Sequence, residues 1–401
     1  MAKNILFCAD GTWNGPDDDE DKDGVPDITN VLKIFFNLDG QNTLGQSALD
    51  NEQERTATNA SGETIQIAKY LHGVGDSNNW LNRMLGGGFG MGVISRIVRG
   101  YTFLSRHYQP GDRIFLIGFS RGAYTARALG GMIVGQGLFH PATVNFADKA
   151  EVYRLGVAAW HRYRKQQTHT ANAHSHSFLP HLAELLAELP GWFARDLTDA
   201  DFVPANIEGI GVWDTVGAMG IPVFREGEQV DLFRFADNRL SPKVAHGLHL
   251  VSVDERRGDF APTFWDPRDG VTQILMPGAH SDVGGGYPVQ GNQSGLSDGG
   301  LNCMTNWCRN LGVRFSATPD IVAHPDPMHG VAHKPWNSPP FDVMPQRSRD
   351  FPDHMCVHVS VLERWNAPAV VANPGEAPAP YRPTNLGSFL QPNGQLIDNN
   401  K

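Results

Sequence analysis

The stretch GFSRGAYTAR, residues 118–127, constrains the fold of this chain more than any other part of its sequence. It places Ser120 between Gly118 and Gly122 in a G-x-S-x-G frame. The apolar run RIFLIGF (113–119) before the serine predicts a buried strand, and the residues after it have helical spacing. A serine on such a tight strand-to-helix turn is exposed for nucleophilic attack, and the glycines permit the turn. The other interpretation is an ordinary serine in a glycine-rich turn.

Short apolar runs alternate with helical patterns along most of the chain. This alternation predicts an α/β fold, α/β-hydrolase-like, with a mainly parallel sheet and helices on both faces. We expect strands at 4–9, 64–75, 113–119 and 355–361, a strand that ends in a loop at 206–217 and another at 271–280, and helices at 29–38, 93–107, 121–134, 148–165, 178–189, 242–254 and 298–311. A single domain over 1–401 is predicted, with a core at about 3–312, a helical cap-like insertion at about 140–200 and a Pro-rich C-terminal extension at about 317–401.

Polar residues follow the ends of four predicted strands: Asp10, Ser120, Asp214 and His280. Ligands collect at the carboxyl ends of parallel strands, so we expect these side chains to meet at one edge of the sheet. A serine hydroxyl needs a histidine to take its proton and a carboxylate to orient that histidine. The sequence therefore predicts a Ser-His-Asp triad at this edge.

The chain order serine, acid, histidine predicts Asp214 as the acid and His280 as the base. Asp214 ends an apolar run in GVWDTVG, and a loop-capping aspartate is the alternative interpretation. Asp237 and Asp254 are weaker candidates for the acid, because they stand in helix-like or turn contexts. His280 stands between ILMPGA and SDVGGGY, where a purely structural histidine is the alternative.

An oxyanion hole needs two backbone N–H groups aimed at the developing charge. Arg121, directly after the serine, is expected to supply one. The loop after the first strand is expected to supply the other, from Gly11 or Thr12. The rival source of the second donor is the glycine-containing loop 72–75.

Five motifs in this order resemble the DUF2235 family, the α/β-hydrolase catalytic domain of Tle1-type type VI secretion phospholipase effectors: FCADGTWN, GFSRGAYTAR, GVWDTVGAMGIP, DERRGDFAPTFW and PGAHSDVGGGY. The resemblance covers roughly residues 3–312. It implies a carboxylic ester hydrolase, an esterase or lipase of phospholipase A type, with Ser120 as nucleophile, His280 as base and Asp214 as acid. The alternatives are a small-substrate carboxylesterase and a non-catalytic binding or assembly module that retains the fold.

The same resemblance implies a lipid or other ester substrate, an immunity or secretion-apparatus partner, and export by a contact-dependent secretion system. Little of this chain follows residue 312, and that part is polar and Pro-rich. We therefore expect the fold and the triad to transfer from the family better than a phospholipid substrate or a toxin role.

The acidic stretch DEDKDGVPD (19–27) matches the first half of a calcium loop. The twelfth position of that loop is Asn30, where a bidentate Glu is usual, so a solvated acidic loop is the alternative. The predicted ligands of this possible structural calcium site are Asp19, Asp21, Asp23 and Asp27. The ester chemistry itself requires no cofactor.

A second stretch with metal-ligand side chains contains His169, His174 and His176. These histidines stand in a polar segment, and a solvated loop is the preferred interpretation.

The net charge of −10 argues against nucleic acid as a partner and limits any lipid contact to a local, peripheral one. The four cysteines form no C-x-x-C pair, and the N-terminus MAKNILFCADGTW lacks the pattern of a signal peptide. Because no run of 18 apolar residues occurs either, we expect no transmembrane helix and synthesis in the cytoplasm with reduced thiols.

Overall fold

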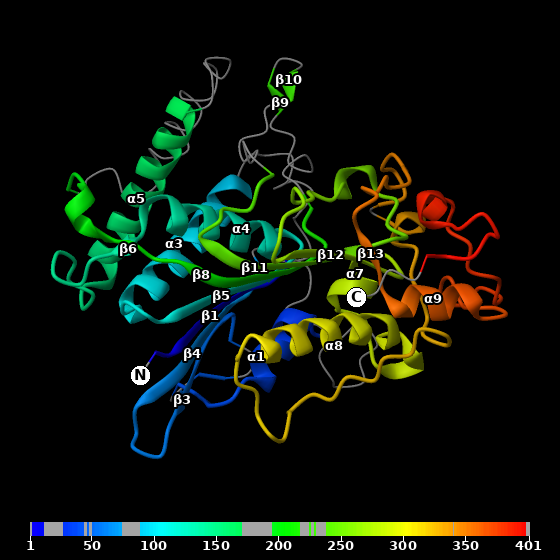
Figure 1. Cartoon of the computed structure of the whole chain (residues 1–401), viewed down its shortest axis with the longest axis horizontal. Helices are drawn as coiled ribbons and strands as arrows, with labels where there is room; N and C mark the ends of the chain where they lie inside the picture. Colours follow the sequence, from blue (N-terminus) through cyan, green and yellow to red (C-terminus); the bar gives the residue numbers. More distant parts are fainter. Residues whose placement is uncertain are drawn as a thin grey trace.

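The computed structural model describes residues 2–11, 27–43, 46–47, 50–73, 89–170, 195–216, 224–225, 228–229, 238–339 and 341–397. Its centre is a nine-stranded sheet in the order β13-β12-β11-β8-β5-β1-β4-β3-β2 (Figure 1). The strands are β1 (Asn4–Ala9), β2 (Gln41–Asn42), β3 (Glu52–Thr58), β4 (Thr64–Leu71), β5 (Arg113–Phe119), β8 (Ile207–Trp213), β11 (Val244–Ser252), β12 (Val271–Met276) and β13 (Cys356–Val357). Two small pairs lie outside this sheet, β6 (Leu138–Phe139) with β7 (Phe202–Val203) and β9 (Phe224–Arg225) with β10 (Glu228–Gln229).

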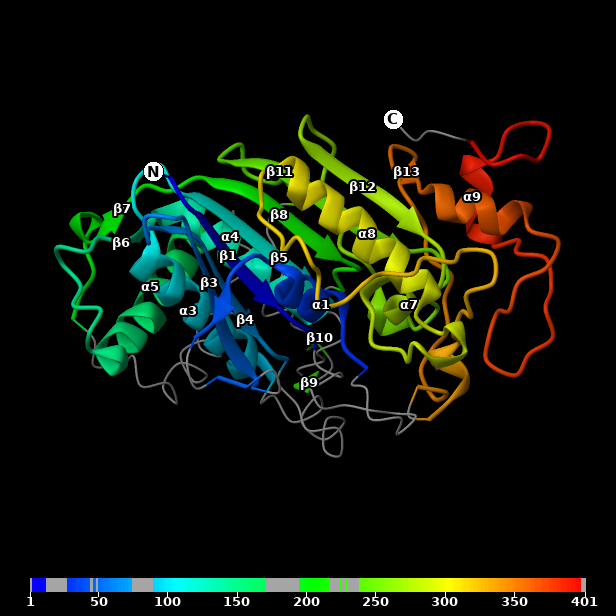
Figure 2. The same ribbon diagram turned by 90° about the horizontal axis from the view of Figure 1, so that it is seen from below.

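Seven neighbouring strands of this sheet, from β13 to β4, pair in parallel. β3 and β2 continue the sheet antiparallel beyond β4. Helices flank both faces, as Figures 1 and 2 show: α3 (Phe89–His107), α4 (Arg121–Gln136) and α5 (Lys149–Thr170) on one, α1 (Asn30–Asn37) and α8 (Gly295–Asn310) on the other. The expectation of an α/β fold with a mainly parallel, two-sided sheet is confirmed.

Parallel pairing requires both faces of a strand to be covered, and the sequence of the central strands explains how this is met. All six residues of β1 are buried, and so are six of the seven in β5. Helix α1 begins where the sequence predicts, because the Thr29 side chain accepts a hydrogen bond from the Leu32 N–H. These elements bring the ends of β1 and β5 side by side in fixed register.

The expectation of a helix at 242–254 is wrong, because β11 occupies that part of the chain as a central strand between β8 and β12. A strand buried on both faces shows a nearly continuous apolar run, which periodicity alone does not separate from a buried helix. The expected strand at 355–361 is only two residues long in β13, and α9 (Val359–Asn366) follows it. The sequence does not predict β2 and β3, the two antiparallel strands at one end of the sheet, since their sequences are largely polar.

The part of the chain predicted as a cap-like insertion contains α5, which packs against α3 and α4. The helix expected at 178–189 lies outside the described residues. The division of the chain into core, insertion and extension stays a prediction.

The C-terminal part of the chain is joined closely to the sheet. Besides contributing β13, it forms a third apolar cluster, in which Val357 and Phe389 share a core with Val251 of β11 and Leu275 of β12. Figure 1 shows this part, in orange and red, next to α7 (His280–Gly284) and the ends of β12 and β13. The Pro-rich extension is therefore well placed to contribute side chains to the edge where the predicted triad stands.

Candidate active site

Three predicted site residues directly follow neighbouring parallel strands. Asp10 follows β1, Ser120 follows β5 and Asp214 follows β8. The register pairs the last residue of β1 with Gly118, and Phe119 with Trp213, so these strands end at nearly the same level. The structure thus brings the predicted residues to one edge of the sheet.

Ser120 occupies a sharp turn between β5 and α4, with φ 56° and ψ −121°. A positive φ is uncommon for a residue with a side chain, and a sparsely populated conformation costs on the order of 1–3 kcal/mol. The flanking glycines explain how the chain fits: a Cβ on Gly118 would lie 2.4 Å from the Gly122 carbonyl oxygen, and one on Gly122 would lie 2.0 Å from the Ala9 carbonyl oxygen. This backbone has the geometry of a nucleophile elbow.

His280 and Asp214 form a direct contact. His280 Nδ1 lies 2.5 Å from Asp214 Oδ2, and both side chains are buried. Because an ionised carboxylate only accepts hydrogen bonds, Nδ1 carries a proton, and neutral His280 is left with Nε2 as an acceptor. Nε2 is buried and has no hydrogen-bond partner in the described part of the chain. This is the protonation pattern that a general base needs.

The His280 ring is held between two aromatic side chains. Its centroid lies 4.6 Å from that of Phe119, the neighbour of Ser120, and 5.1 Å from that of Phe260. Helix α7, which begins with His280, packs so tightly on Phe119 that a Cβ on Gly284 would overlap the ring. These contacts place His280 beside the elbow, although Ser120 Oγ and His280 Nε2 are not hydrogen-bonded to each other.

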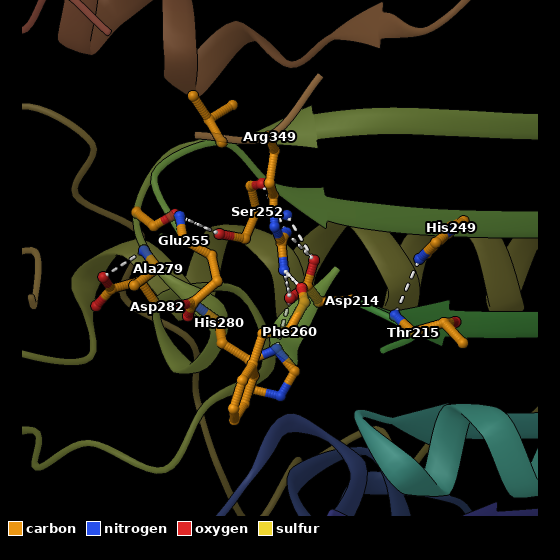
Figure 3. A network of polar contacts seen from close by, with 12 residues as sticks. Asp214, Thr215, His249, Ser252, Glu255, Phe260, Ala279, His280, Asp282 and Arg349 are labelled. Carbon is orange, nitrogen blue, oxygen red and sulfur yellow. Dashed lines mark hydrogen bonds and ion pairs between the residues drawn. The ribbon is translucent and has the colours of Figure 1, made fainter. Parts of the chain in front are cut away.

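Asp214 is held by more than His280, as Figure 3 shows. Its Oδ1 accepts hydrogen bonds from the Ser252 N–H (3.0 Å) and from Arg349 Nη1 (2.6 Å), and its Oδ2 accepts one from Arg349 Nη2 (2.9 Å). Burial alone would raise the pKa of Asp214, but the charge of Arg349 and the contact with His280 hold that pKa well below its usual range. Asp214 is therefore ionised across the ordinary pH range.

A second charged pair lies behind His280. Glu255 binds Arg257 through both oxygens, at 2.9 and 2.7 Å, and accepts a hydrogen bond from the His280 backbone N–H at 3.2 Å. Burial lowers the pKa of His280 below its ordinary value, Arg257 lowers it further, and Asp214 and Glu255 oppose that effect. The imidazole is therefore neutral, and able to accept a proton, at neutral pH.

Of the three residues expected to supply the oxyanion donors, the structure describes Arg121 and Gly11. Arg121 is the first residue of α4, so its N–H belongs to the helix N-terminus, which has no intrahelical acceptors. Gly11 adjoins the elbow, since a Cβ built on it would lie 3.5 Å from the Ser120 Cβ. However, its N–H donates to Asp10 Oδ1 at 2.6 Å. Thr12 lies outside the described residues.

The rival loop at 72–75 is described only as far as Gly73. The carbonyl of His72 accepts a hydrogen bond from Arg96 Nε at 3.1 Å. The same Arg96 binds the Asp10 carbonyl through Nη2 at 2.7 Å, so this loop and the Asp10 turn are tied to one side chain.

The remaining candidates lie elsewhere or outside the described residues. Asp254 accepts hydrogen bonds from Tyr381 Oη (2.9 Å) and the Gly278 N–H (2.7 Å), whereas His280 Nδ1 pairs with Asp214. Asp237 is not among the described residues. Of the predicted calcium ligands only Asp27, which is buried, is described. The side chains of His169, His174 and His176 and the residues Asp19, Asp21 and Asp23 lie outside the described part.

Within the described residues, no three or more His, Cys, Asp or Glu side chains are grouped to hold a metal ion. In the same part of the chain, no helix combines the length and the apolar character needed to cross a bilayer.

Sequence reasoning missed Arg349 and the role of Glu255. Arg349 stands in an irregular Pro-rich segment, where neither periodicity nor a motif marks a buried cation. Glu255 and Arg257 belong to DERRGDFAPTFW, one of the five motifs, and that motif was the available signal for a site contribution.

The chain is similar to several known proteins. The family model "T6SS, Phospholipase effector Tle1-like, catalytic domain" matches residues 3–307. An uncharacterized protein of Saccharomyces cerevisiae is 28% identical over 274 residues, covering 68% of this chain and 34% of that protein. Similar solved structures are an uncharacterized protein from Pseudomonas aeruginosa (TM-score 0.41, 20% identity, covering 79% of this chain and 47% of that one) and the Tle1 effector bound to the VgrG spike of the type 6 secretion system (TM-score 0.34, 18% identity, covering 72% and 52%).

This chain spans about a third of the length of the yeast relative and about half of each solved chain. The family model, in contrast, covers most of this chain and contains all three predicted triad residues. The chain therefore belongs to the family of Tle1-like catalytic domains of type VI secretion phospholipase effectors.

Proposed function

We propose that this protein is a serine hydrolase that cleaves carboxylic esters through an acyl-serine intermediate, with Ser120, His280 and Asp214 as its triad. The observation that carries the proposal is the buried His280–Asp214 pair beside a serine in a strained strand-to-helix turn. A structural histidine or a loop-capping aspartate would not need a buried, unpartnered Nε2 next to such a turn.

In the proposed reaction, His280 Nε2 takes the proton of the Ser120 hydroxyl while Oγ attacks the ester carbonyl carbon. Asp214 accepts the Nδ1–H bond and stabilises the imidazolium that forms. The oxyanion of the tetrahedral intermediate is held by the Arg121 N–H and by a second N–H from the loop after β1, for which Gly11 and Thr12 are the candidates. His280 then protonates the leaving alcohol. In the second half, water attacks the acyl-serine carbonyl while His280 takes its proton, and His280 returns that proton to Ser120 Oγ as the carboxylic acid leaves.

The hydrogen bond between His280 Nε2 and Ser120 Oγ is expected to form when substrate binds, since catalytic hydrogen bonds are often long or poorly aligned in the free enzyme.

The proposed substrate is a lipid or phospholipid ester, because the family is one of phospholipase effectors. On the same ground we propose delivery by a type VI secretion apparatus, with a component of that apparatus and an immunity protein as partners. A small-substrate carboxylesterase is the second candidate function. A non-catalytic module would retain the fold without turnover.

Hydrolysis of p-nitrophenyl esters of increasing acyl length, followed by profiling of the products from mixed phospholipids and neutral esters, separates these functions. A lipid hydrolase should prefer long acyl chains, whereas a small-substrate esterase should lose rate as the chain lengthens. Ser120→Ala serves as the control in both assays. No Ser120-dependent hydrolysis of any ester would leave the non-catalytic module as the answer.

A further inference from the structure

A buried arginine from the C-terminal part of the chain holds the proposed catalytic acid. Arg349 binds Asp214 Oδ1 and Oδ2 through Nη1 and Nη2, and it also donates to the carbonyls of Ser252 (2.9 Å) and Phe260 (2.6 Å). Its side chain is only 4% exposed. This residue lies beyond position 307, where the family model ends.

The backbone before Arg349 is fixed to the site. Gln346 forms an antiparallel bridge with Arg257, the Gly258 N–H donates to the Pro345 carbonyl at 2.8 Å, and the Arg347 N–H donates to the Arg256 carbonyl at 2.7 Å. These three contacts join the segment to the loop that carries Glu255 and Arg257, the residues behind His280. The guanidinium of Arg349 is therefore brought to Asp214 by an anchored backbone segment, residues 345–349, which we call the strap.

The bidentate contact between Arg349 and Asp214 has one geometric consequence. With both oxygens bound, the Asp214 carboxylate cannot rotate without breaking a charge-assisted hydrogen bond, and Oδ2 stays directed at His280 Nδ1. The carboxylate plane then determines where the imidazole ring, and with it Nε2, is held.

The contact also has an electrostatic consequence, because Arg349 Nη2 and His280 Nδ1 share the same oxygen. The charge of Arg349 offsets the stabilisation that Asp214 gives to a protonated His280. Among the described residues, the other charged groups that act on His280 are Glu255, which accepts its backbone N–H, and Arg257, which is paired with Glu255. Among these groups, Arg349 alone acts on His280 through the carboxylate of the triad.

We propose that Arg349 is a positioning residue for ester hydrolysis: its fork orients the Asp214 carboxylate toward His280, and its charge keeps His280 a weaker base. The inference rests on the proposed function for its kinetic part. A merely structural arginine would fasten the extension to the core and leave the titration of His280 unchanged.

Two substitutions separate orientation from charge. Arg349→Gln keeps a polar donor on a shorter side chain and removes the charge, whereas Arg349→Lys keeps the charge and most of the reach but removes the planar fork. Arg347→Gln is the matched control, because Arg347 stands two positions away, is 81% exposed and pairs only loosely with Asp350.

The first measurement is the pKa of the His280 imidazole, obtained from an NMR titration. The His280 signal is assigned by its loss in His280→Gln. A unit charge about 5 Å away, at an effective dielectric constant near 20, moves a pKa by about two units. We expect Arg349→Gln to raise the His280 pKa by about one to two units, and both Arg349→Lys and Arg347→Gln to leave it within about half a unit.

The second measurement is the pH profile of kcat/KM on a short ester. The apparent pKa of its acid limb should rise in Arg349→Gln by the same amount as the NMR pKa of His280. In both Arg349 variants kcat should fall about tenfold or more, since small misplacements of a catalytic group are costly. KM should stay within about twofold, because Arg349 is not expected to touch substrate.

Unchanged His280 titration in folded Arg349→Gln would overturn the electrostatic part, and wild-type kcat in Arg349→Lys would overturn the positioning part. Should Arg349→Gln not fold, the Lys variant still decides, with lowered kcat and an unmoved His280 pKa as the expected result. Failure of the proposed function is recognised separately: the wild type would then hydrolyse no ester, while the NMR titration would still report on Arg349.

Discussion

Replacing Gly122 by alanine tests whether the elbow geometry sets the position of the proposed nucleophile. Gly122 stands in the first turn of α4, two residues after Ser120. A Cβ at this position would lie 2.0 Å from the Ala9 carbonyl oxygen, 2.5 Å from its carbon and 2.6 Å from the Asp10 carbonyl oxygen. All three are backbone atoms at the end of β1, so no side chain can move away to relieve the overlap.

The size of the effect follows from those contacts. Cβ contacts below 3.0 Å are essentially never observed, so the start of α4 has to move by about 1 Å relative to β1. Overpacking of this kind typically costs about 1–3 kcal/mol of the free energy of unfolding. A misplacement of about 1 Å at a catalytic group costs on the order of 100-fold in rate. We therefore expect Gly122→Ala to be folded but destabilised, with kcat/KM lowered about 100-fold.

Urea unfolding and ester hydrolysis measure the two effects on the same samples. Gly299→Ala, inside helix α8, is the control, since among the described residues a Cβ there meets only the Met276 methyl, at 3.8 Å. Alanine in a helix interior is favoured over glycine by about 0.5–1 kcal/mol, so this variant should be slightly more stable and fully active. Wild-type stability and turnover in Gly122→Ala would refute the argument that this glycine fixes the elbow.

The other predictions concern the triad and the acidic loop. Ser120→Ala should abolish ester hydrolysis, and activity above about 1% of wild type would exclude Ser120 as nucleophile. Asp214→Asn should lower kcat by about 10³- to 10⁴-fold, whereas Asp254→Asn should reduce stability and spare turnover; the reverse result would move the acid to Asp254. Because the pKa of Asp214 is depressed in the folded chain, the stability that its carboxylate supplies is present above about pH 4 and lost at lower pH. Between about pH 6 and pH 2, the free energy of unfolding should therefore fall less steeply in Asp214→Asn than in the wild type. If residues 19–27 bind calcium, the wild-type melting temperature should be higher in millimolar calcium than in EGTA, and the double substitution Asp21→Asn with Asp23→Asn should remove the difference; identical wild-type melts would leave a solvated loop.

The sequence was most informative where local signals and tertiary structure agree. The strand at 113–119, the helix after it and the glycines around Ser120 follow from chain-local patterns, and the structure confirms these elements. The pairing of Asp214 with His280, 66 positions apart, was accessible because both follow predicted strands of one sheet. Chain order and strand ends were sufficient to bring these two side chains together.

Two features were beyond sequence reasoning for physical reasons. The expectation of a helix at 242–254 is wrong, because a mixed segment that contains Gly247 does not itself show that the strands on either side, β8 and β12, will make it a strand. Arg349 acquires its importance only from Asp214, 135 positions away, and from the strap that holds it. Nothing in its own irregular segment distinguishes a buried guanidinium from a solvated one.

Labelling with a fluorophosphonate probe, read by intact mass and peptide mapping, tests the central claim most directly. An activated serine on an intact elbow reacts covalently, so one adduct should form on Ser120 in the wild type. Labelling should be lost in Ser120→Ala and slowed strongly in His280→Gln, in which the general base is absent. Wild-type protein that remains unlabelled, or labelling at another residue that persists in Ser120→Ala, would contradict the assignment of Ser120 as the nucleophile.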